Sequence, residues 1–180
     1  MRVKPGGLGS APGAGRDRGP EDAFETAMVE QGQRLTRLAY YLCGDRSRAE
    51  DLVAEAFAAT WPKWSSGRVD NLLAYLRRAV VNLAAKDRRH RLVVLRHDAR
   101  SAPPAPSPGA DQNLWARVDL ARVLAALPAD QRVVVALRYL EDMAEADMAA
   151  LLGVSPGTVK SRLARALDSM RAHVEGGEDA

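Results

Sequence analysis

The chain has 180 residues, with 26 Lys and Arg against 23 Asp and Glu, so its formal net charge is only +3. This length allows one domain of ordinary size or two small ones. Cys43 is the single cysteine, which excludes a disulfide framework and a zinc site built on cysteines. No apolar run approaches the length of a membrane span, so we expect no membrane partner.

Charge is segregated along the chain. Acidic residues gather at 50–55 and 142–147, whereas basic residues gather at 77–91 and 160–171. This segregation indicates one surface for an anionic polymer and another for a basic protein.

The first twenty residues are rich in Gly, Pro, Arg and Ala and lack the apolar region of a secretory signal. They predict a disordered tail (1–20) and a cytoplasmic protein. Apolar residues from Phe24 to Leu42 recur at helical spacing, and Gly44 with Asp45 breaks that first helix. Ser47, with Glu50 three residues later, predicts a capping box for the next helix.

The next helix is predicted from about Arg48 to Trp61, ended by Pro62. Asp51 and Glu55 share one face, and neither has a Lys or Arg four residues downstream. Arg48 is the expected partial partner of Asp51. A solvated acidic face and a docking face for a basic partner explain this pattern equally well, whereas paired catalytic carboxylates or metal ligands lack supporting residues nearby.

A third helix is predicted from about Asn71 to Arg89, with a basic row opposite its apolar stripe. The row suits single-stranded or melted DNA, because Arg and Lys track phosphates and Asn bonds a base edge. On this helix alone, a solvated basic face is favoured instead, and tryptophans are more often core residues than base platforms. The row comprises Arg78, Asn82, Lys86 and Arg89, with Arg77 and Arg88 on its flanks.

A Pro-rich stretch at 101–109 predicts a flexible linker, with bounds 96–112, between two helical segments. Four more helical patterns follow at 113–175. The first stops at Leu127, and Pro128 or Asp130 opens the second, which includes the β-branched run 133–135.

The last two patterns, 143–171, predict a helix-turn-helix. Gly153 takes the positive φ that ends the first helix, and Ser155 caps the second, with Pro156 at its first position. One face of the second helix is apolar. Its other face carries Lys160, Ser161, Arg162 and Arg165, which is typical of a recognition helix.

Three motifs in this order resemble the extracytoplasmic-function class of bacterial RNA polymerase sigma factors, in the sigma-seventy family. They are AEDLVAEAF at 49–57, AYLRRA at 74–79 continuing through Asn82 to Arg89, and LLGVSPGTVKSRL at 151–163, preceded by Leu127-Pro128. The resemblance covers about 23–174. It implies an all-α fold of two small helical domains, region two at 21–95 and region four at 113–175.

The resemblance also implies roles. Transcription chemistry would belong to the polymerase, so the chain is expected not to be an enzyme and to need no cofactor or metal. Expected partners are core RNA polymerase at its β′ clamp helices and β flap, promoter DNA, and an anti-sigma factor of the kind that holds many members of the class inactive. Residues implied to dock on the polymerase are Asp51, Leu52, Glu55 and Phe57. Residues implied to contact the minus-ten element are Trp64, Arg78, Asn82, Lys86, Arg88 and Arg89. Residues implied to contact the minus-thirty-five element are Ser155, Thr158, Lys160, Ser161, Arg162 and Arg165.

One position departs from the family pattern. Ala144 stands where a Ser or Thr usually caps the first helix of the helix-turn-helix, at a cost of about 1 kcal/mol unless Asp142 replaces that cap. We expect the two domains of the free chain to pack together through exposed apolar and basic faces.

Two other functions are alternatives. A stand-alone helix-turn-helix DNA-binding regulator is the alternative, favoured by dimerisation and palindromic operators, although nothing in the chain indicates a dimer seam. A hydrolytic enzyme lacks a nucleophile and base, since the three histidines lie in a basic stretch or near the chain end.

Overall fold

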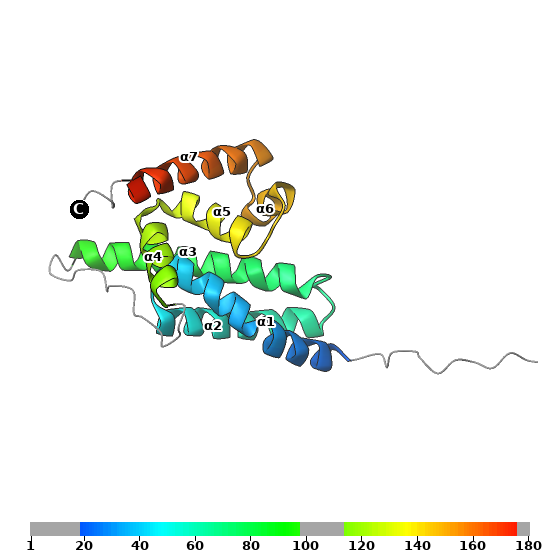
Figure 1. The fold of residues 1–180 in the computed structure, drawn as a ribbon. Helices are drawn as coiled ribbons and strands as arrows, with labels where there is room; N and C mark the ends of the chain where they lie inside the picture. Colours follow the sequence, from blue (N-terminus) through cyan, green and yellow to red (C-terminus); the bar gives the residue numbers. More distant parts are fainter. Residues whose placement is uncertain (1–18, 98–113, 176–180) are drawn as a thin grey trace, which may run out of the picture.

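The computed structural model describes residues 19–97 and 114–175, which form seven α-helices and no strand (Figure 1). The predicted all-α fold is therefore confirmed, while most of the predicted tail and linker lies outside the described residues. The helices are α1 (Pro20–Cys43), α2 (Arg46–Ser65), α3 (Leu72–His97), α4 (Leu114–Ala126), α5 (Ala129–Tyr139), α6 (Glu145–Leu152) and α7 (Pro156–Glu175). No described helix is long and apolar enough to cross a membrane.

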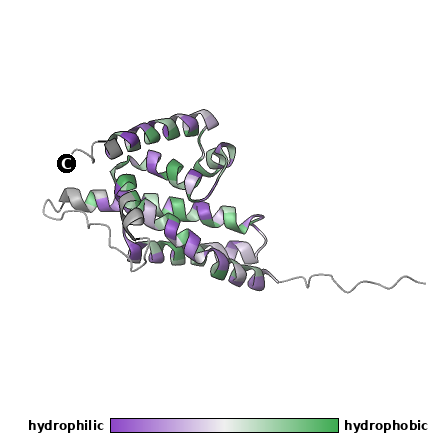
Figure 2. Ribbon diagram, viewed as in Figure 1, coloured by the Kyte–Doolittle hydropathy of each residue, from purple (hydrophilic) through white to green (hydrophobic). Residues whose placement is uncertain are grey.

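The first three helices pack on one another as an N-terminal unit. Leu35 and Leu38 of α1 and Leu76 of α3 are fully buried. The Phe24 ring of α1 meets two aromatic rings of α2 edge-on, with centroids 5.6 Å from Phe57 and 5.0 Å from Trp61. Apolar residues recur along each helix in Figure 2, as an amphipathic bundle requires.

Helix α2 differs from the prediction at both ends. Asp45, not Ser47, is its N-cap, because the Asp45 carboxylate accepts a hydrogen bond from the Arg48 backbone N–H at 2.8 Å. The helix also continues past Pro62 to Ser65. Pro62 removes only one backbone hydrogen bond so near the end, and the Ser66 hydroxyl satisfies two last-turn carbonyls by donating to Pro62 O and Lys63 O.

Helix α3 begins as predicted but ends later. The Asn71 side chain accepts a hydrogen bond from the Ala74 backbone N–H at 3.0 Å and caps the first turn. The helix continues two turns beyond the predicted end at Arg89, to His97, because no Gly or Pro interrupts that run. Its last two residues therefore fall in the segment predicted as linker.

The last four helices form a C-terminal unit in which α5, α6 and α7 pack together. Pro128, rather than Asp130, occupies the N-cap position of α5, and the β-branched run 133–135 lies inside that helix, as predicted. Val134, Met148 and Val159 are fully buried at its centre. The unit thus holds α7 with one face inward and one face outward.

The two units pack against each other, as expected, with α5 and α4 against α1 and α6 against α3. In Figure 1, α7 and α2 lie on opposite sides of this arrangement. The expected basic face is present in Arg34 and Arg77, but both arginines pair with one buried acid, Glu141, which was not predicted.

Candidate nucleic-acid and protein-docking surfaces

An exposed acidic face lies on α2. Asp51 and Glu55 stand one turn apart, both are exposed, and neither forms an ion pair with any described residue. The side chains of Leu52 and Phe57 are instead buried, at 6% and 5% exposure. Of the four residues expected to dock on the polymerase, two therefore expose their charge to solvent, and the other two fix the helix to the core.

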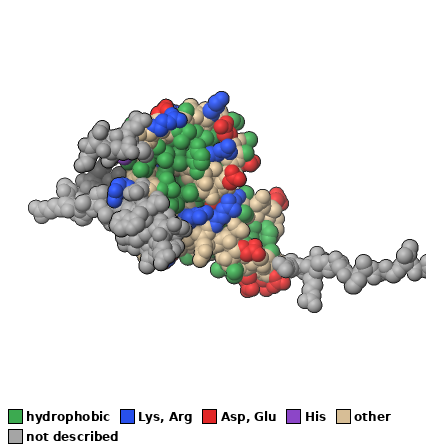
Figure 3. Space-filling model, in the orientation of Figure 1, with side chains coloured by type: hydrophobic (Ala, Val, Ile, Leu, Met, Phe, Trp, Pro, Cys, Tyr) green, Lys and Arg blue, Asp and Glu red, His purple; other side chains and the backbone are tan. Residues whose placement is uncertain are grey.

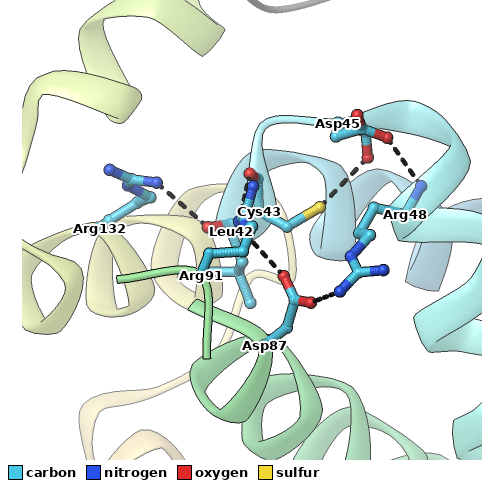
Figure 4. Close-up of polar contacts among 7 residues, drawn as sticks. All are labelled: Leu42, Cys43, Asp45, Arg48, Asp87, Arg91 and Arg132. Carbon is cyan, nitrogen blue, oxygen red and sulfur yellow. Dashed lines mark hydrogen bonds and ion pairs between the residues drawn. The ribbon is translucent and has the colours of Figure 1, made fainter. Parts of the chain in front are cut away.

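A groove separates α2 from α3, with Asp51, Leu52 and Glu55 on one wall and Leu83, Lys86 and His90 on the other. Arg48 lines it too, and its guanidinium forms its ion pair with Asp87 of α3 (Figure 4), while the charge of Asp51 attracts it only more weakly. The hydrogen bond from Arg48 to Asp87, with the attraction between the two charges, raises the pKa of Arg48. The groove therefore has an acidic rim on α2 facing Lys86 on α3.

Asp87 anchors the end of α1 as well. Its carboxylate, with only 5% of the side chain exposed, also pairs with Arg91 at 3.0 Å, and Arg91 donates to the Cys43 backbone carbonyl at 2.9 Å (Figure 4). The Cys43 thiol is buried, as expected, and donates to Asp45 O at 3.2 Å. Burial raises the pKa of the Cys43 thiol, so the neutral thiol is favoured.

The basic row on α3 is present: Arg78, Asn82, Lys86 and Arg89 are all exposed. The flanking arginines face elsewhere. Arg77 is turned toward Glu141, and Arg88 is half-buried, close enough to Arg132 of α5 for their like charges to lower the pKa of Arg132. Five of the six residues expected to contact the minus-ten element belong to α3, and Arg88 alone among these is directed to the junction between the units.

Trp64, the sixth of these residues, lies at the end of α2 and is half-buried. Its indole N–H donates to Pro20 O at 2.8 Å and so ties the start of α1 to the end of α2. The Lys63 ammonium donates to the Tyr75 hydroxyl at 2.6 Å. The Trp64 side chain therefore has a structural role in the free chain, as the preference for core tryptophans indicated.

The helix-turn-helix has the predicted local geometry. Gly153 ends α6 with φ +67°, and the Ser155 hydroxyl accepts a hydrogen bond from the Thr158 backbone N–H at 3.1 Å. The Ser155 and Thr158 hydroxyls lie 2.9 Å apart. Val159 and Leu163, on the inward face of α7, are buried. Ser155 therefore caps the N-terminus of the recognition helix.

The outward face of α7 carries the charge that the sequence predicted. Lys160, Ser161 and Arg165 are exposed, and Arg165 donates to Ser161 O at 3.1 Å. Arg162 is only 24% exposed, because its guanidinium Nε pairs with Asp130 Oδ2 of α5 at 3.3 Å. This ion pair orients the Arg162 side chain, whereas Lys160 and Arg165 form no ion pair with a described residue.

The N-terminus of α6 lacks a side-chain cap, as expected. Ala144 occupies the N-cap position with extended backbone, and no side chain caps the helix. Asp142 does not replace the cap, since it is held at φ +50° in the preceding turn.

Two charged residues at the junction of the units were not predicted from the sequence. Arg132 of α5 is 9% exposed and donates to the carbonyls of Leu42, Ala125 and Leu127. Burial lowers the pKa of Arg132. The other residue is Glu141, whose side chain is 1% exposed. A charged residue inside the apolar pattern of α5 was the one available signal for Arg132, and Glu141 gave none.

Comparison with known proteins shows that two models of one family match this chain. The family model of sigma-70 region 2 matches residues 28–92, and that of sigma-70 region 4 matches residues 117–170. These segments contain α2 with most of α3, and the helix-turn-helix, respectively.

Known relatives match over most of the chain. The chain is 36% identical to the RNA polymerase sigma-E factor of Streptomyces coelicolor over 82% of this chain and 84% of the relative. It is 32% identical to the ECF RNA polymerase sigma factor SigL of Mycobacterium tuberculosis, over 83% and 90%. The solved structure of the sigma factor RpoE of Bartonella quintana, in complex with the anti-sigma factor NepR, aligns with a TM-score of 0.71 at 26% identity, covering 85% of this chain and 97% of that one. The chain therefore belongs to the sigma-70 family, as an RNA polymerase sigma factor of the extracytoplasmic-function (ECF) class.

Proposed function

We propose that this sigma factor binds core RNA polymerase through α2 and reads a two-part promoter with α3 and α7. The observation that carries the docking assignment is the pair of exposed acids, Asp51 and Glu55, without a partner among the described residues. An unpaired acidic face is electrostatically complementary to a basic helix of a partner. We assign it to the β′ clamp helices of the polymerase.

The α3 row is the proposed minus-ten surface. Arg78, Lys86 and Arg89 are exposed cations that would follow the phosphates of an opened strand, while the Asn82 amide would bond a base edge. The chemistry of these side chains supports this role. Arg88 and Trp64 are the weaker members of the set, because Arg88 faces α5 and the Trp64 N–H is already bonded to Pro20 O.

The outward face of α7 is the proposed minus-thirty-five surface. Lys160, Ser161 and Arg165 would contact DNA directly, with Thr158 at the N-terminal end of the helix, where a recognition helix approaches base edges. Arg162, oriented by Asp130, is the residue best placed to read one base. The C-terminal unit would also contact the β flap of the polymerase.

Several further assignments complete the proposal. Residues 21–95 act as region two and 113–175 as region four, and the segment 96–112 passes through the polymerase between them. The protein works in the cytoplasm as a regulatory subunit, and the polymerase carries out the chemistry. An anti-sigma factor is a further proposed partner, by analogy with the structural relative that is bound to one.

Run-off transcription tests this proposal. Purified core polymerase would be given a library of promoter fragments, with the full-length chain, with its Asp51→Arg variant, and without either. Only the wild-type chain should give selective transcripts, and the promoters of these transcripts should share two spaced elements. Specific DNA binding by the chain without transcripts would overturn the proposal and favour the stand-alone regulator instead.

A further inference from the structure

Glu141 joins the two units through both of its carboxylate oxygens. Oε1 accepts a hydrogen bond from Arg34 Nε of α1 at 3.1 Å, and Oε2 accepts one from Arg77 Nε of α3 at 2.6 Å. The Glu141 backbone carbonyl accepts a third, from Arg34 Nη2 at 3.0 Å. Two guanidinium groups of the N-terminal unit thus converge on a single anion that the C-terminal unit supplies.

Because this anion is buried between the two units, the contact exists only while the units are packed together, an arrangement called here the closed chain. The Glu141 side chain is 1% exposed, whereas Arg77 is 15% and Arg34 is 37% exposed. A carboxylate so far removed from water is tolerated only while charged partners satisfy it. Separation of the units returns Glu141 to water and leaves Arg34 and Arg77 without their anion. In Figure 3, Lys and Arg side chains gather where the two units meet.

The proposed function requires such a separation. Minus-ten and minus-thirty-five elements lie about 25 base pairs apart, which is roughly 85 Å at about 3.4 Å per base pair. A closed chain of this length has a radius of gyration of about 16 Å, so its whole width is roughly 40 Å. The closed chain therefore cannot place α3 and α7 on both elements at once.

The position of the arginine pair indicates what replaces Glu141. Arg77 directly precedes Arg78, the first member of the exposed row on α3. Two guanidinium groups that grip both oxygens of one carboxylate have the donor geometry that also binds the two free oxygens of a phosphodiester. The anion nearest to this row, on the proposed function, is the backbone of the promoter strand.

We propose that Arg34 and Arg77 are a binding pair for backbone phosphates of promoter DNA, and that Glu141 occupies this pair in the closed chain. Closure and DNA binding then compete for the same two guanidinium groups. This inference rests on the proposed placement of DNA along α3. It adds two DNA contacts to the exposed row and assigns Glu141 the role of an internal phosphate substitute.

The first measurement is the opening of the full-length chain. Donor and acceptor dyes on Ala59→Cys of α2 and Ala164→Cys of α7, both exposed positions, would report the distance between the units in a Cys43→Ala background. Glu141→Gln removes the charge and keeps the size, so we expect it to shift the chain toward the open state by about 5- to 150-fold. The matched control is Glu145→Gln, the same change at an exposed acid of α6, which should leave the distance distribution unchanged.

A second variant opens the junction from the other side. Arg34→Gln alters a side chain that is already partly in water, and in the closed chain it leaves the buried Glu141 Oε1 without its charged partner. It is expected to open the chain as well, and circular dichroism would establish that each variant is folded. If both Glu141→Gln and Arg34→Gln stay as closed as the wild type, the proposed role of Glu141 in holding the chain closed is refuted.

The second measurement is the affinity of the full-length chain for a fluorescein-labelled single strand of 20 nucleotides. Glu141→Gln should bind this strand more tightly than the wild type, by the same factor as its opening. Adding Arg77→Gln to Glu141→Gln should remove that gain. An open Glu141→Gln chain with wild-type affinity would overturn the phosphate assignment.

Arg78→Gln separates this inference from the proposed function. It changes the exposed row and leaves the junction intact. A loss of affinity in Arg78→Gln, with no gain in Glu141→Gln, would refute the inference alone. Unchanged affinity in Arg78→Gln would instead refute the placement of DNA on α3, and the inference with it.

Discussion

Asp51 and Asp87 line the same groove between α2 and α3 but have opposite environments. Asp51 is exposed and pairs with no described residue, whereas the Asp87 side chain is 5% exposed and pairs with both Arg48 and Arg91. One carboxylate is thus committed to holding α2, α3 and the end of α1 together. The other is exposed and forms no ion pair with a described residue, which suits the docking role proposed for it.

Removing the charge of Asp87 should therefore cost stability. We expect Asp87→Asn to lower the free energy of unfolding by about 1–3 kcal/mol, because it weakens one charge-assisted hydrogen bond, from Arg48, and one ion pair, with Arg91, in a mostly buried site. Asp51→Asn, the same change on the other wall of the groove, should stay within about 0.5 kcal/mol of the wild type. Urea unfolding followed by circular dichroism checks both values, and equal effects would contradict the division of roles.

Reversing the charge of Asp51 should instead weaken binding to the polymerase and leave stability unchanged. Asp51→Arg is expected to weaken binding to core polymerase by at least about 100-fold, because like charges placed together at an interface cost several kcal/mol. Its melting temperature should not change. Glu145→Arg, a reversal at an exposed site on α6, is the control. Unaltered affinity of Asp51→Arg for the core enzyme, measured by fluorescence anisotropy, would remove the docking assignment.

Local chemistry explains which features could be predicted. Gly153 and Ser155 were predicted from the residues themselves, because a positive φ and a side-chain cap depend only on the neighbouring backbone. Ser47 was a wrong prediction because Asp45, two residues earlier, offers an equally good cap. Pro62 was also misread, since its effect on a helix depends on how much helix remains after it.

Long-range contacts explain what could not be predicted. Arg34 and Glu141 are 107 residues apart, and no periodicity of the sequence relates them. The main partner of Arg48 was not predicted for the same reason, because Asp87 lies 39 residues away. Within the candidate site, residue type and helix face predicted that Asp51 and Glu55 are exposed. The apolar periodicity of the same helix also predicted that Phe57 is buried, as it is, and only the family resemblance assigned it to docking.

The uncapped start of α6 offers a stabilising change. Ala144 already has the extended backbone of an N-cap residue, at φ −69° and ψ 151°, but provides no acceptor for the first-turn N–H groups. Ala144→Ser should raise the free energy of unfolding by about 0.5–1 kcal/mol. Ala146→Ser, inside the same helix, should not stabilise the protein. If thermal melts show no gain for Ala144→Ser, the first turn of α6 is already satisfied by water.

The buried thiol of Cys43 predicts a dependence of stability on pH. Burial raises the pKa of Cys43 in the folded chain above its value in the unfolded chain. A group whose pKa is raised by folding contributes its stability in full below the unfolded pKa. That contribution is lost as the pH rises through the folded pKa.

We therefore expect the free energy of unfolding to fall above about pH 8.5, the usual pKa of a cysteine thiol. Cys43→Ala, which has no thiol to ionise, should show a shallower fall over the same range. The native thiol should also react with Ellman's reagent much more slowly than the unfolded chain at pH 8. Equally fast reaction in both states would show that Cys43 is accessible.

The ion pair between Arg162 and Asp130 gives the last prediction, on the recognition helix. A guanidinium held by a carboxylate loses less freedom on binding DNA and is directed to one place, which favours reading a base over following phosphates. Arg162→Ala should then weaken binding of the holoenzyme to its minus-thirty-five element by about 1–3 kcal/mol, and should reduce discrimination at one position.

Two variants separate this role from a phosphate contact. Asp130→Asn frees Arg162 without removing it, so it should lower discrimination at the same position by a smaller amount. Lys160→Ala removes an exposed cation that has no ion-pair partner among the described residues, and it should weaken all sequences equally. The measurement is competition between promoter fragments that differ at single positions of the minus-thirty-five element. If Arg162→Ala gives the uniform loss expected of Lys160→Ala, Arg162 contacts only the backbone, and its pairing with Asp130 serves to hold α7 against α5.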